Sequence, residues 1–101
     1  MTWAVTMDVH EPVELYDAVH RALLERTGGA VDGLLVHLAR QTDDGFQVIE
    51  VWESREEFER YSAELVGPVA VEVLQGRPRT PTVVSPFDVR GLVLPQAGVA
   101  V

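Results

Sequence analysis

The N-terminal part of the chain changes from a strand-like to a helix-like pattern of hydrophobic positions. Apolar and polar side chains alternate from residue 2 to residue 9, which is the two-residue period of a β-strand with unequal faces. After Pro12, apolar side chains recur three and four positions apart, up to the pair Gly28-Gly29. Proline suits the start of a helix and glycine its end, so this segment predicts an amphipathic helix.

Two strand-like segments follow and predict a β-hairpin. Residues 33–40 and 46–53 are rich in apolar side chains, and the sequence Gln-Thr-Asp-Asp-Gly separates them. An Asp-Gly pair such as Asp44-Gly45 between two such segments is a strong signal for a short hairpin turn. We therefore expect the second and third strands to pair antiparallel.

A second helix is predicted after this hairpin. Ser54 and Glu57 have the spacing of a capping box, and apolar side chains at helical spacing follow them. The pair Gly67-Pro68 is expected to interrupt this helix. Residues 69–74 are then expected to form a further short helical turn that ends at Gly76.

The C-terminal part of the chain predicts one broken strand and a tail. Residues 76–81 are rich in Gly and Pro and predict a loop. Residues 82–94 are strand-like, but Pro86 and Gly91 interrupt them, which indicates an edge strand, a bulge or two short segments. Residues 95–101 are expected to form a flexible C-terminal tail.

The predicted order is β-α-β-β-α-β, which is the order of a ferredoxin-like α+β fold. Its single domain is expected to comprise residues 1–94, with an antiparallel sheet that has helices on one face only. The strands nevertheless have apolar side chains on both faces, such as Leu38 and Ile49 on one and Trp52 on the other. A bare apolar face of that size exceeds what monomers usually expose. We therefore expect a second copy of the chain to cover it, which gives a homodimer.

The composition excludes several classes of function. The chain has 101 residues, of which 47% are hydrophobic and 24% charged, enough for one folded core. Eight basic against sixteen acidic residues give a net charge of −8, which disfavours nucleic acid as a partner. There is no Cys, so disulfides and thiolate metal sites are excluded. We expect no membrane segment and no secretory signal, and hence a cytoplasmic protein.

His37, Glu50 and Trp52 are the most informative candidate functional residues. A hairpin loop with an even number of residues places odd-numbered residues of the second strand opposite even-numbered residues of the third. We therefore expect these three side chains on one face of the sheet, within cross-strand reach. A buried His and Glu should pair, and the carboxylate fixes the tautomer of the imidazole. Such a pair could remove a proton from a phenol or a 1,3-dicarbonyl compound, which makes His37 and Glu50 the candidate catalytic residues.

Two alternatives stay open for these side chains. The pair of His37 and Glu50 could be a structural hydrogen bond in the core of a dimer. The aromatic side chains could line an apolar ligand cavity, or they could pack as ordinary core. The candidate substrate-binding residues are Trp3, Tyr16, Trp52, Tyr61 and Phe87.

The other two histidines do not indicate a metal site. His10 lies in a predicted loop and His20 at the border of the apolar stripe of the first helix. Neither has a second ligand at metal-binding spacing, so both are expected to be surface or boundary residues. The pair Gly28-Gly29 precedes a strand instead of a helix, which does not fit a phosphate-binding loop. We therefore predict neither a bound metal nor a cofactor.

The central part of the chain also has a recognisable pattern. The positions that carry it are Gly33, His37, Asp44-Gly45, Glu50-Val51-Trp52-Glu53-Ser54, Phe58, Leu65 and Pro68. Through these positions the chain resembles the antibiotic biosynthesis monooxygenase family of the dimeric α+β barrel superfamily, over residues 2–94. The resemblance implies a ferredoxin-like protomer, two sheets packed face to face in a dimer, and a pocket between the sheet and the helices of each protomer.

The family that the chain resembles does not have a single activity. It includes cofactor-free quinone-forming oxygenases and haem-degrading enzymes, and its superfamily relatives include polyketide cyclases and lactone isomerases. The haem-degrading members use an Asn, a Trp and a His ligand, where this chain has Met7-Asp8, Tyr61 and residues 69–71. Haem degradation is therefore not expected. The chain contains no Asn at all, which also departs from the set of residues used by the cofactor-free oxygenases.

Together, the pattern and the resemblance predict a small-molecule-binding dimeric α+β barrel protein. Its predicted activity is that of a cofactor-independent, monooxygenase-like or cyclase/isomerase-like enzyme acting on an apolar aromatic or polyketide-type substrate. The alternative is a non-catalytic ligand carrier, or a structural dimer, with the same fold.

Overall fold

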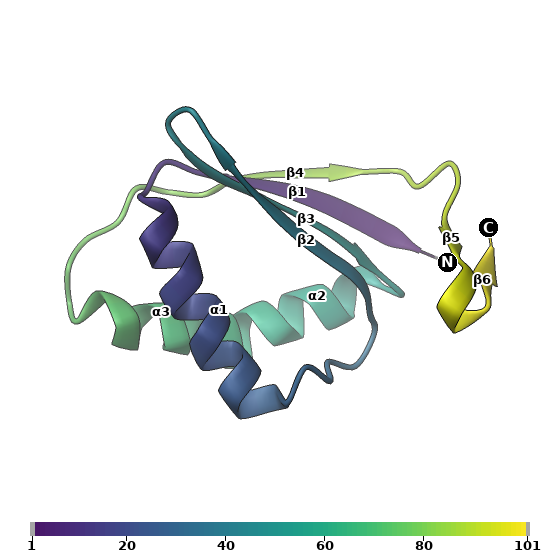
Figure 1. Ribbon diagram of the computed structural model, residues 1–101, viewed down its shortest axis with the longest axis horizontal. Helices are drawn as coiled ribbons and strands as arrows, with labels where there is room; N and C mark the ends of the chain where they lie inside the picture. Colours follow the sequence, from purple (N-terminus) through teal and green to yellow (C-terminus); the bar gives the residue numbers. More distant parts are fainter. Residues whose placement is uncertain (1, 101) are drawn as a thin grey trace.

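The computed structural model describes residues 2–100, and the terminal residues 1 and 101 lie outside the described residues. Figure 1 shows helices and strands in the predicted order, followed by a small C-terminal hairpin. The long elements are β1 (Trp3–Val9), α1 (Val13–Thr27), β2 (Leu34–Thr42), β3 (Gly45–Trp52), α2 (Arg55–Tyr61), α3 (Gly67–Leu74) and β4 (Val83–Phe87).

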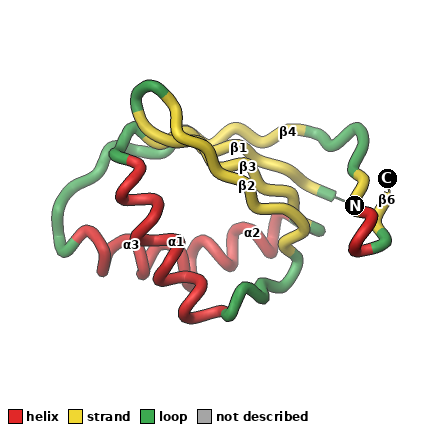
Figure 2. Tube along the Cα trace, viewed as in Figure 1, coloured by secondary structure: helices red, strands yellow, loops and turns green. Residues whose placement is uncertain are grey.

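The four long strands form one antiparallel sheet in the order β2-β3-β1-β4. All three helices lie on one side of this sheet (Figure 2). The predicted ferredoxin-like α+β fold is thereby confirmed. The fully buried large side chains are Val5 and Trp52, from the central strands β1 and β3, and Val69, from the helix α3 that packs over them.

The second helix is not interrupted at Gly67-Pro68, which corrects the sequence prediction. The chain stays helical from α2 to α3 through one turn of π-helix, Ser62–Val66. In this wider turn the backbone N–H of Gly67 donates to the carbonyl oxygen of Ser62, and Pro68 then lies in the first turn of α3. Pro68 has no N–H to donate, and it follows directly after this wider turn, where the regular hydrogen-bond pattern of an α-helix is already interrupted.

Two of the predicted capping signals are confirmed, whereas α3 ends at Gln75 (φ 53°), one residue before the predicted Gly76. The hydroxyl oxygen of Ser54 accepts a hydrogen bond from the backbone N–H of Glu57 (3.3 Å) and the hydroxyl group donates to its carboxylate (3.0 Å). Gly28 ends α1 with a φ of 66°, a left-handed conformation that glycine adopts without strain.

The strand-like segment at the C-terminal end divides into two short segments, one of the alternatives that Pro86 and Gly91 left open. β4 pairs with β1 at the edge of the sheet, with Pro86 opposite Val5. β5 (Val93–Leu94) pairs instead with β6 (Val99–Ala100) in a separate two-stranded unit beside the main body (Figure 1). The predicted domain end at residue 94 falls inside this unit, and the flexibility of the tail stays a prediction.

Candidate functional site

The β2–β3 hairpin places His37 directly opposite Glu50, as the sequence predicted. Thr42 pairs with Gly45, so the loop between the strands is the two-residue turn Asp43-Asp44. This even-numbered loop fixes the register in which His37 and Glu50 share one face of the sheet. The parity argument from the turn is therefore confirmed.

Gly45 is needed for a close approach to β1 and not for the turn that the Asp44-Gly45 pair predicted. Gly45 is the first residue of β3, and its φ is not in the left-handed region. A Cβ atom there would lie 1.9 Å from the carbonyl oxygen of Val9 on β1. Any larger residue would therefore push the end of β1 away from the hairpin, which would disturb the strand pairing next to the site.

Three side chains, two from β3 and one from α1, join His37 in a continuous chain of hydrogen bonds. Nδ1 of His37 lies 2.7 Å from Oε2 of Glu50 on β3, and the Nε1–H of Trp52 donates to Oε1 of the same carboxylate at 3.1 Å. At the other end, the hydroxyl oxygen of Tyr16 on α1 lies 2.7 Å from Nε2 of His37. The sequence prediction that His37, Glu50 and Trp52 lie on one sheet face is confirmed.

Burial differs along this chain of hydrogen bonds. The side chain of Glu50 is only 7% exposed, whereas that of His37, on the edge strand β2, is 28% exposed. Trp52 is fully buried and Tyr16 is half-buried. The carboxylate of Glu50 is thus enclosed, whereas His37 and Tyr16 are accessible to solvent.

The tyrosines near this carboxylate are held in their neutral form. The pKa of Tyr16 is raised above its usual value of 10.0, first by burial, then by the negative charge of Glu50 and then by that of Asp17. The pKa of Tyr61 is raised for the same first two reasons. Tyr16 is therefore a neutral phenol at neutral pH.

His20 is half-buried, as expected for a boundary residue, and its ring also belongs to the site. Its ring lies nearly parallel to the ring of His37 (centroids 5.4 Å apart, 6° between planes) and to that of Tyr16 (5.2 Å, 15°). The signal that could have identified it is its spacing, because residues four apart on a helix lie on the same face. Once Tyr16 is placed beside His37, His20 necessarily follows one turn later.

Four of the five predicted substrate-binding aromatic residues lie on the helix-facing side of the sheet or on the helices that cover it. Trp52 packs against Tyr61 at a centroid distance of 5.6 Å, and Trp3 lies at the same end of the sheet, opposite Trp52. The fifth, Phe87, pairs with Ala4 and therefore points to the other face, where it is 44% exposed. The structure does not bring Phe87 together with the other four.

Two hollows lie near the site. The smaller one, of about 150 Å³, lies between α1 and the edge strand β2, and the larger one, of about 360 Å³, lies at the tip of the β2–β3 hairpin. Phe46 lines both hollows, and Tyr16 lines the smaller one. Neither hollow is lined by Trp3, Trp52 or Tyr61, so a cavity built from those residues stays a prediction.

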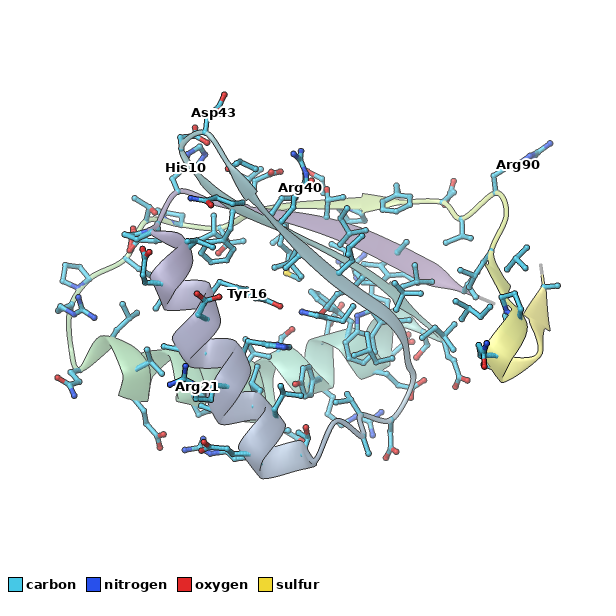
Figure 3. The ribbon with its side chains drawn as sticks, viewed as in Figure 1. His10, Tyr16, Arg21, Arg40, Asp43 and Arg90 are labelled. Atoms are coloured by element: carbon cyan, nitrogen blue, oxygen red, sulfur yellow. The ribbon has the colours of Figure 1, made fainter. Side chains whose placement is uncertain are left out.

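A second histidine–carboxylate pair lies at the tip of the hairpin. Nδ1 of His10 is 3.0 Å from Oδ2 of Asp44, and the two side chains are 51% and 70% exposed. Figure 3 shows His10 beside this tip, where Asp43 is also labelled, and Tyr16 pointing from α1 into the interior. Within residues 2–100, no three metal-ligating side chains converge and no helix is long and apolar enough to cross a bilayer.

No protein-family model matches the chain, and no curated protein does. Solved structures do match over nearly their whole length. SnoaB, a cofactor-independent oxygenase from Streptomyces nogalater, is 20% identical, with 93% of this chain and 95% of that chain covered and a TM-score of 0.58. A structure described as an antibiotic biosynthesis monooxygenase is 19% identical, with 88% and 98% covered and a TM-score of 0.60.

A third similar structure is a dimeric ferredoxin-like protein of unknown function from Thermobifida fusca. It is 13% identical, with 88% of this chain and 92% of that chain covered and a TM-score of 0.62. At these identities the likeness establishes a shared fold and nothing finer. The chain has the fold of antibiotic biosynthesis monooxygenase structures, as its resemblance to that family led us to expect.

Proposed function

We propose that this protein belongs to the antibiotic biosynthesis monooxygenase family and is an enzyme that works without a cofactor. It removes a proton from an apolar aromatic or polyketide-type substrate, as the first step of a monooxygenase-like or a cyclase/isomerase-like reaction. The observation that carries this proposal is the hydrogen bond between His37 and the enclosed carboxylate of Glu50. The fold that the chain shares with SnoaB, a cofactor-independent oxygenase, supports it by analogy.

The chemistry follows from the orientation of the imidazole. An ionised Glu50 accepts a hydrogen bond at Nδ1–H of His37, which leaves Nε2 as the basic nitrogen. When Nε2 takes up a proton, the imidazolium that forms lies beside the carboxylate, which stabilises it without any rearrangement. The substrate is left as a phenolate or an enolate, a form that is reactive toward oxygen or toward an internal electrophile.

A non-catalytic ligand carrier or structural dimer is the second candidate function. It is favoured by the fact that, among the described residues, every buried side-chain nitrogen and oxygen has a hydrogen-bond partner without a ligand. A chain of polar groups that is complete on its own can serve to fix the fold. The two functions differ in whether the protein removes a proton from the ligand.

Deuterium exchange at the acidic carbon of acetylacetone distinguishes them. We expect the protein to accelerate this exchange, and we expect His37→Ala and Glu50→Gln to remove about 10²-fold or more of the acceleration, as is usual for a lost general base. His10→Ala is the matched control, because it removes the other carboxylate-paired histidine. Equal exchange by the parent protein and the two site variants would leave the carrier as the better explanation. Mass spectrometry of small molecules that co-purify with the protein would then identify the cargo.

We also propose that the protein is a homodimer in which the helix-free sheet faces pack together. On that face Leu38 is 56% exposed, Val83 53% and Phe87 44%, so the face exposes large apolar side chains at both of its edges. The Thermobifida fusca protein of the same fold is described as dimeric. Two such faces would bury on the order of 2,000 Å² in total.

Light scattering tests the homodimer directly. We expect twice the chain mass for the parent protein, and the mass of one chain after Leu38→Asp. The control Val71→Asp changes an apolar side chain that is even more exposed, at 66%, but lies on α3 on the other side of the sheet. A parent protein with the mass of one chain at micromolar concentration would contradict the proposal.

A further inference from the structure

Tyr16 is the member of the hydrogen-bonded chain that also lines a hollow. The hollow of about 150 Å³ between α1 and β2 is lined by Tyr16 and not by His37, Glu50 or Trp52. We infer that the atom that receives the substrate proton is the hydroxyl oxygen of Tyr16, and that this hollow takes a single phenol or enol ring of the substrate. This inference rests on the proposed function, in which His37 and Glu50 act as the base.

Both ring nitrogens of His37 are already engaged in the structure. Nδ1 faces Glu50 at 2.7 Å and Nε2 faces the hydroxyl of Tyr16 at 2.7 Å. A substrate could reach Nε2 directly only by displacing Tyr16. The hydroxyl oxygen, by contrast, uses its proton in the bond to Nε2 and keeps its acceptor capacity for a substrate O–H.

The transfer is balanced with respect to protons and charge. The substrate O–H or acidic C–H proton passes to the hydroxyl oxygen of Tyr16, while the proton that Tyr16 carried passes to Nε2 of His37. The substrate becomes a phenolate or enolate, His37 becomes an imidazolium that keeps its Nδ1–H hydrogen bond to Glu50, and Tyr16 is a neutral phenol before and after. No electron is transferred to or from the protein in this step.

The charges around Tyr16 favour the passage of a proton through its hydroxyl group over the formation of a tyrosinate. Burial, the carboxylate of Glu50 and that of Asp17 all raise the pKa of Tyr16, so a tyrosinate is disfavoured. A hydroxyl that resists ionisation acts best when its own proton leaves as the new one arrives. The same two carboxylates are the charged groups that face the hydroxyl from β3 and from its own helix.

The walls and the size of the hollow indicate the class of ligand. Val13 and Ala39 are apolar walls, and Phe46 adds an aromatic ring whose centroid is 5.5 Å from that of Tyr16. A volume of about 150 Å³ is enough for one benzene ring. Asp17, Arg40 and Gln41 also line the hollow. The side chain of Arg40 points away from the helices in Figure 3, and its Nε donates to Gln47.

His20 is a positioning residue in this arrangement. It stacks on the rings of both Tyr16 and His37, and so holds the two in the planes that their hydrogen bond requires. We expect His20→Ala to weaken proton transfer and His20→Phe to restore it, because phenylalanine keeps a flat ring in the stack. A role in which the His20 imidazole itself carries the proton would give equal losses in both variants.

Ionisation of bound para-nitrophenol tests the inference, because the phenol and the phenolate absorb at different wavelengths. We expect the parent protein to bind the probe and to increase its ionisation about tenfold, which is a fall of about one unit in its apparent pKa. Tyr16→Phe keeps the ring and should bind the probe while losing this increase. His10→Ala should behave like the parent protein.

The outcomes separate this inference from the proposed function. If Tyr16→Phe ionises the probe as well as the parent does while His37→Ala does not, His37 acts directly, and only the role of Tyr16 is wrong. If neither variant changes the ionisation, the base itself is wrong. A parent protein that does not bind the probe at millimolar concentration would overturn the assignment of a single-ring phenol to the hollow.

Nitrogen NMR of ¹⁵N-histidine-labelled protein gives a second test that needs no ligand. We expect His37 to carry its proton on Nδ1 and to show a hydrogen-bonded, unprotonated Nε2, whose signal shifts in Tyr16→Phe while that of Nδ1 does not. The opposite tautomer, with the proton on Nε2, would overturn the inference because Tyr16 would then be the acceptor.

Discussion

The molecule contains two histidine–carboxylate pairs that differ mainly in their surroundings. The His37–Glu50 pair has its atoms 2.7 Å apart, with the side chains 28% and 7% exposed, whereas the His10–Asp44 pair is 3.0 Å apart and 51% and 70% exposed. An exposed ion pair usually contributes about 0–1 kcal/mol to stability. Breaking an enclosed pair by removing one partner usually costs about 3–5 kcal/mol.

The difference between the pairs comes from the position of the carboxylate in the fold. Glu50 is in β3, a central strand, and its side chain points toward the helices beside the fully buried Trp52. Asp44 is in the two-residue turn at the tip of the same hairpin, where water reaches it from several sides. The hairpin thus places the Glu50 carboxylate where burial requires a partner, and the Asp44 carboxylate where water can replace one.

Replacing Glu50 should have the largest effect on stability. Glu50→Leu leaves Trp52 Nε1–H and His37 Nδ1 without their acceptor, and an unsatisfied buried donor costs about 1–3 kcal/mol. Because His37 is partly exposed and can turn toward water, we expect a total loss of about 2–4 kcal/mol in the free energy of unfolding, measured with urea. The matched change Asp44→Ala should cost less than about 1 kcal/mol. Equal losses would show that the two pairs are energetically alike.

Trp52→Phe should have the next largest effect, because it removes one hydrogen bond while keeping most of the ring. Oxygen Oε1 of Glu50 then loses the N–H donor at 3.1 Å, and we expect a loss of about 1–3 kcal/mol in urea unfolding, packing changes included. Trp3→Phe is the control, since Trp3 is half-buried and packs against Phe58 at a centroid distance of 4.9 Å. A larger loss for Trp3→Phe would mean that ring volume, not the hydrogen bond, is what matters.

The sequence predicted the elements whose signals are local. The capping residues Ser54 and Glu57 and the αL glycine Gly28 gave helix ends that the structure confirms. The continuity of α2 and α3 was not predictable, because a π-turn at Ser62–Val66 depends on how the helix packs and not on the pattern of the glycine and proline alone. The separate β5–β6 hairpin was likewise not predictable, since two residues in each strand are too few to show an alternation of apolar and polar side chains.

The site was predictable to the extent that strand parity determines it. The even-numbered turn was sufficient to pair His37 with Glu50, because every side chain in a strand has a fixed face. The contacts of α1 were not predictable. Tyr16 was among the candidate residues, but its contact with His37 and that of His20 depend on how a helix packs on a sheet, across a long separation in sequence. Phe87 was misplaced in the aromatic set, because the register of an edge strand far along the chain has no local signal.

The charge of Glu50 should also be detectable at the two tyrosines, and that of Asp44 should not. Glu50 raises the pKa of both Tyr16 and Tyr61, after burial. In Glu50→Gln we therefore expect both tyrosines to ionise at lower pH than in the parent protein, as followed by tyrosinate absorbance. Asp44→Asn should leave these midpoints unchanged, and a shift there would contradict the comparison.

The same raised pKa values determine how stability responds to alkaline pH. An acid whose folded pKa lies above its unfolded value of 10.0 contributes its full stabilisation below that pH and loses it as the pH rises through the folded pKa. The free energy of unfolding should therefore fall above about pH 10. Tyr16→Phe should fall less steeply than the parent protein. We expect this difference to be smaller than the loss in Trp52→Phe, because both hydroxyls are only partly buried and solvent screens them.

His10→Ala should have the smallest effect of all. Both members of its pair are more than half exposed, so solvation replaces most of what the 3.0 Å contact contributes. We expect the free energy of unfolding to change by less than about 0.5 kcal/mol, and the difference from the parent protein to vanish at about 1 M salt, where the Debye length is only about 3 Å. Urea unfolding of both proteins at low and high salt measures this. A salt-independent loss of about 2 kcal/mol would mean that His10 stabilises the hairpin tip by packing, and that enclosure of the carboxylate is not what separates the two pairs.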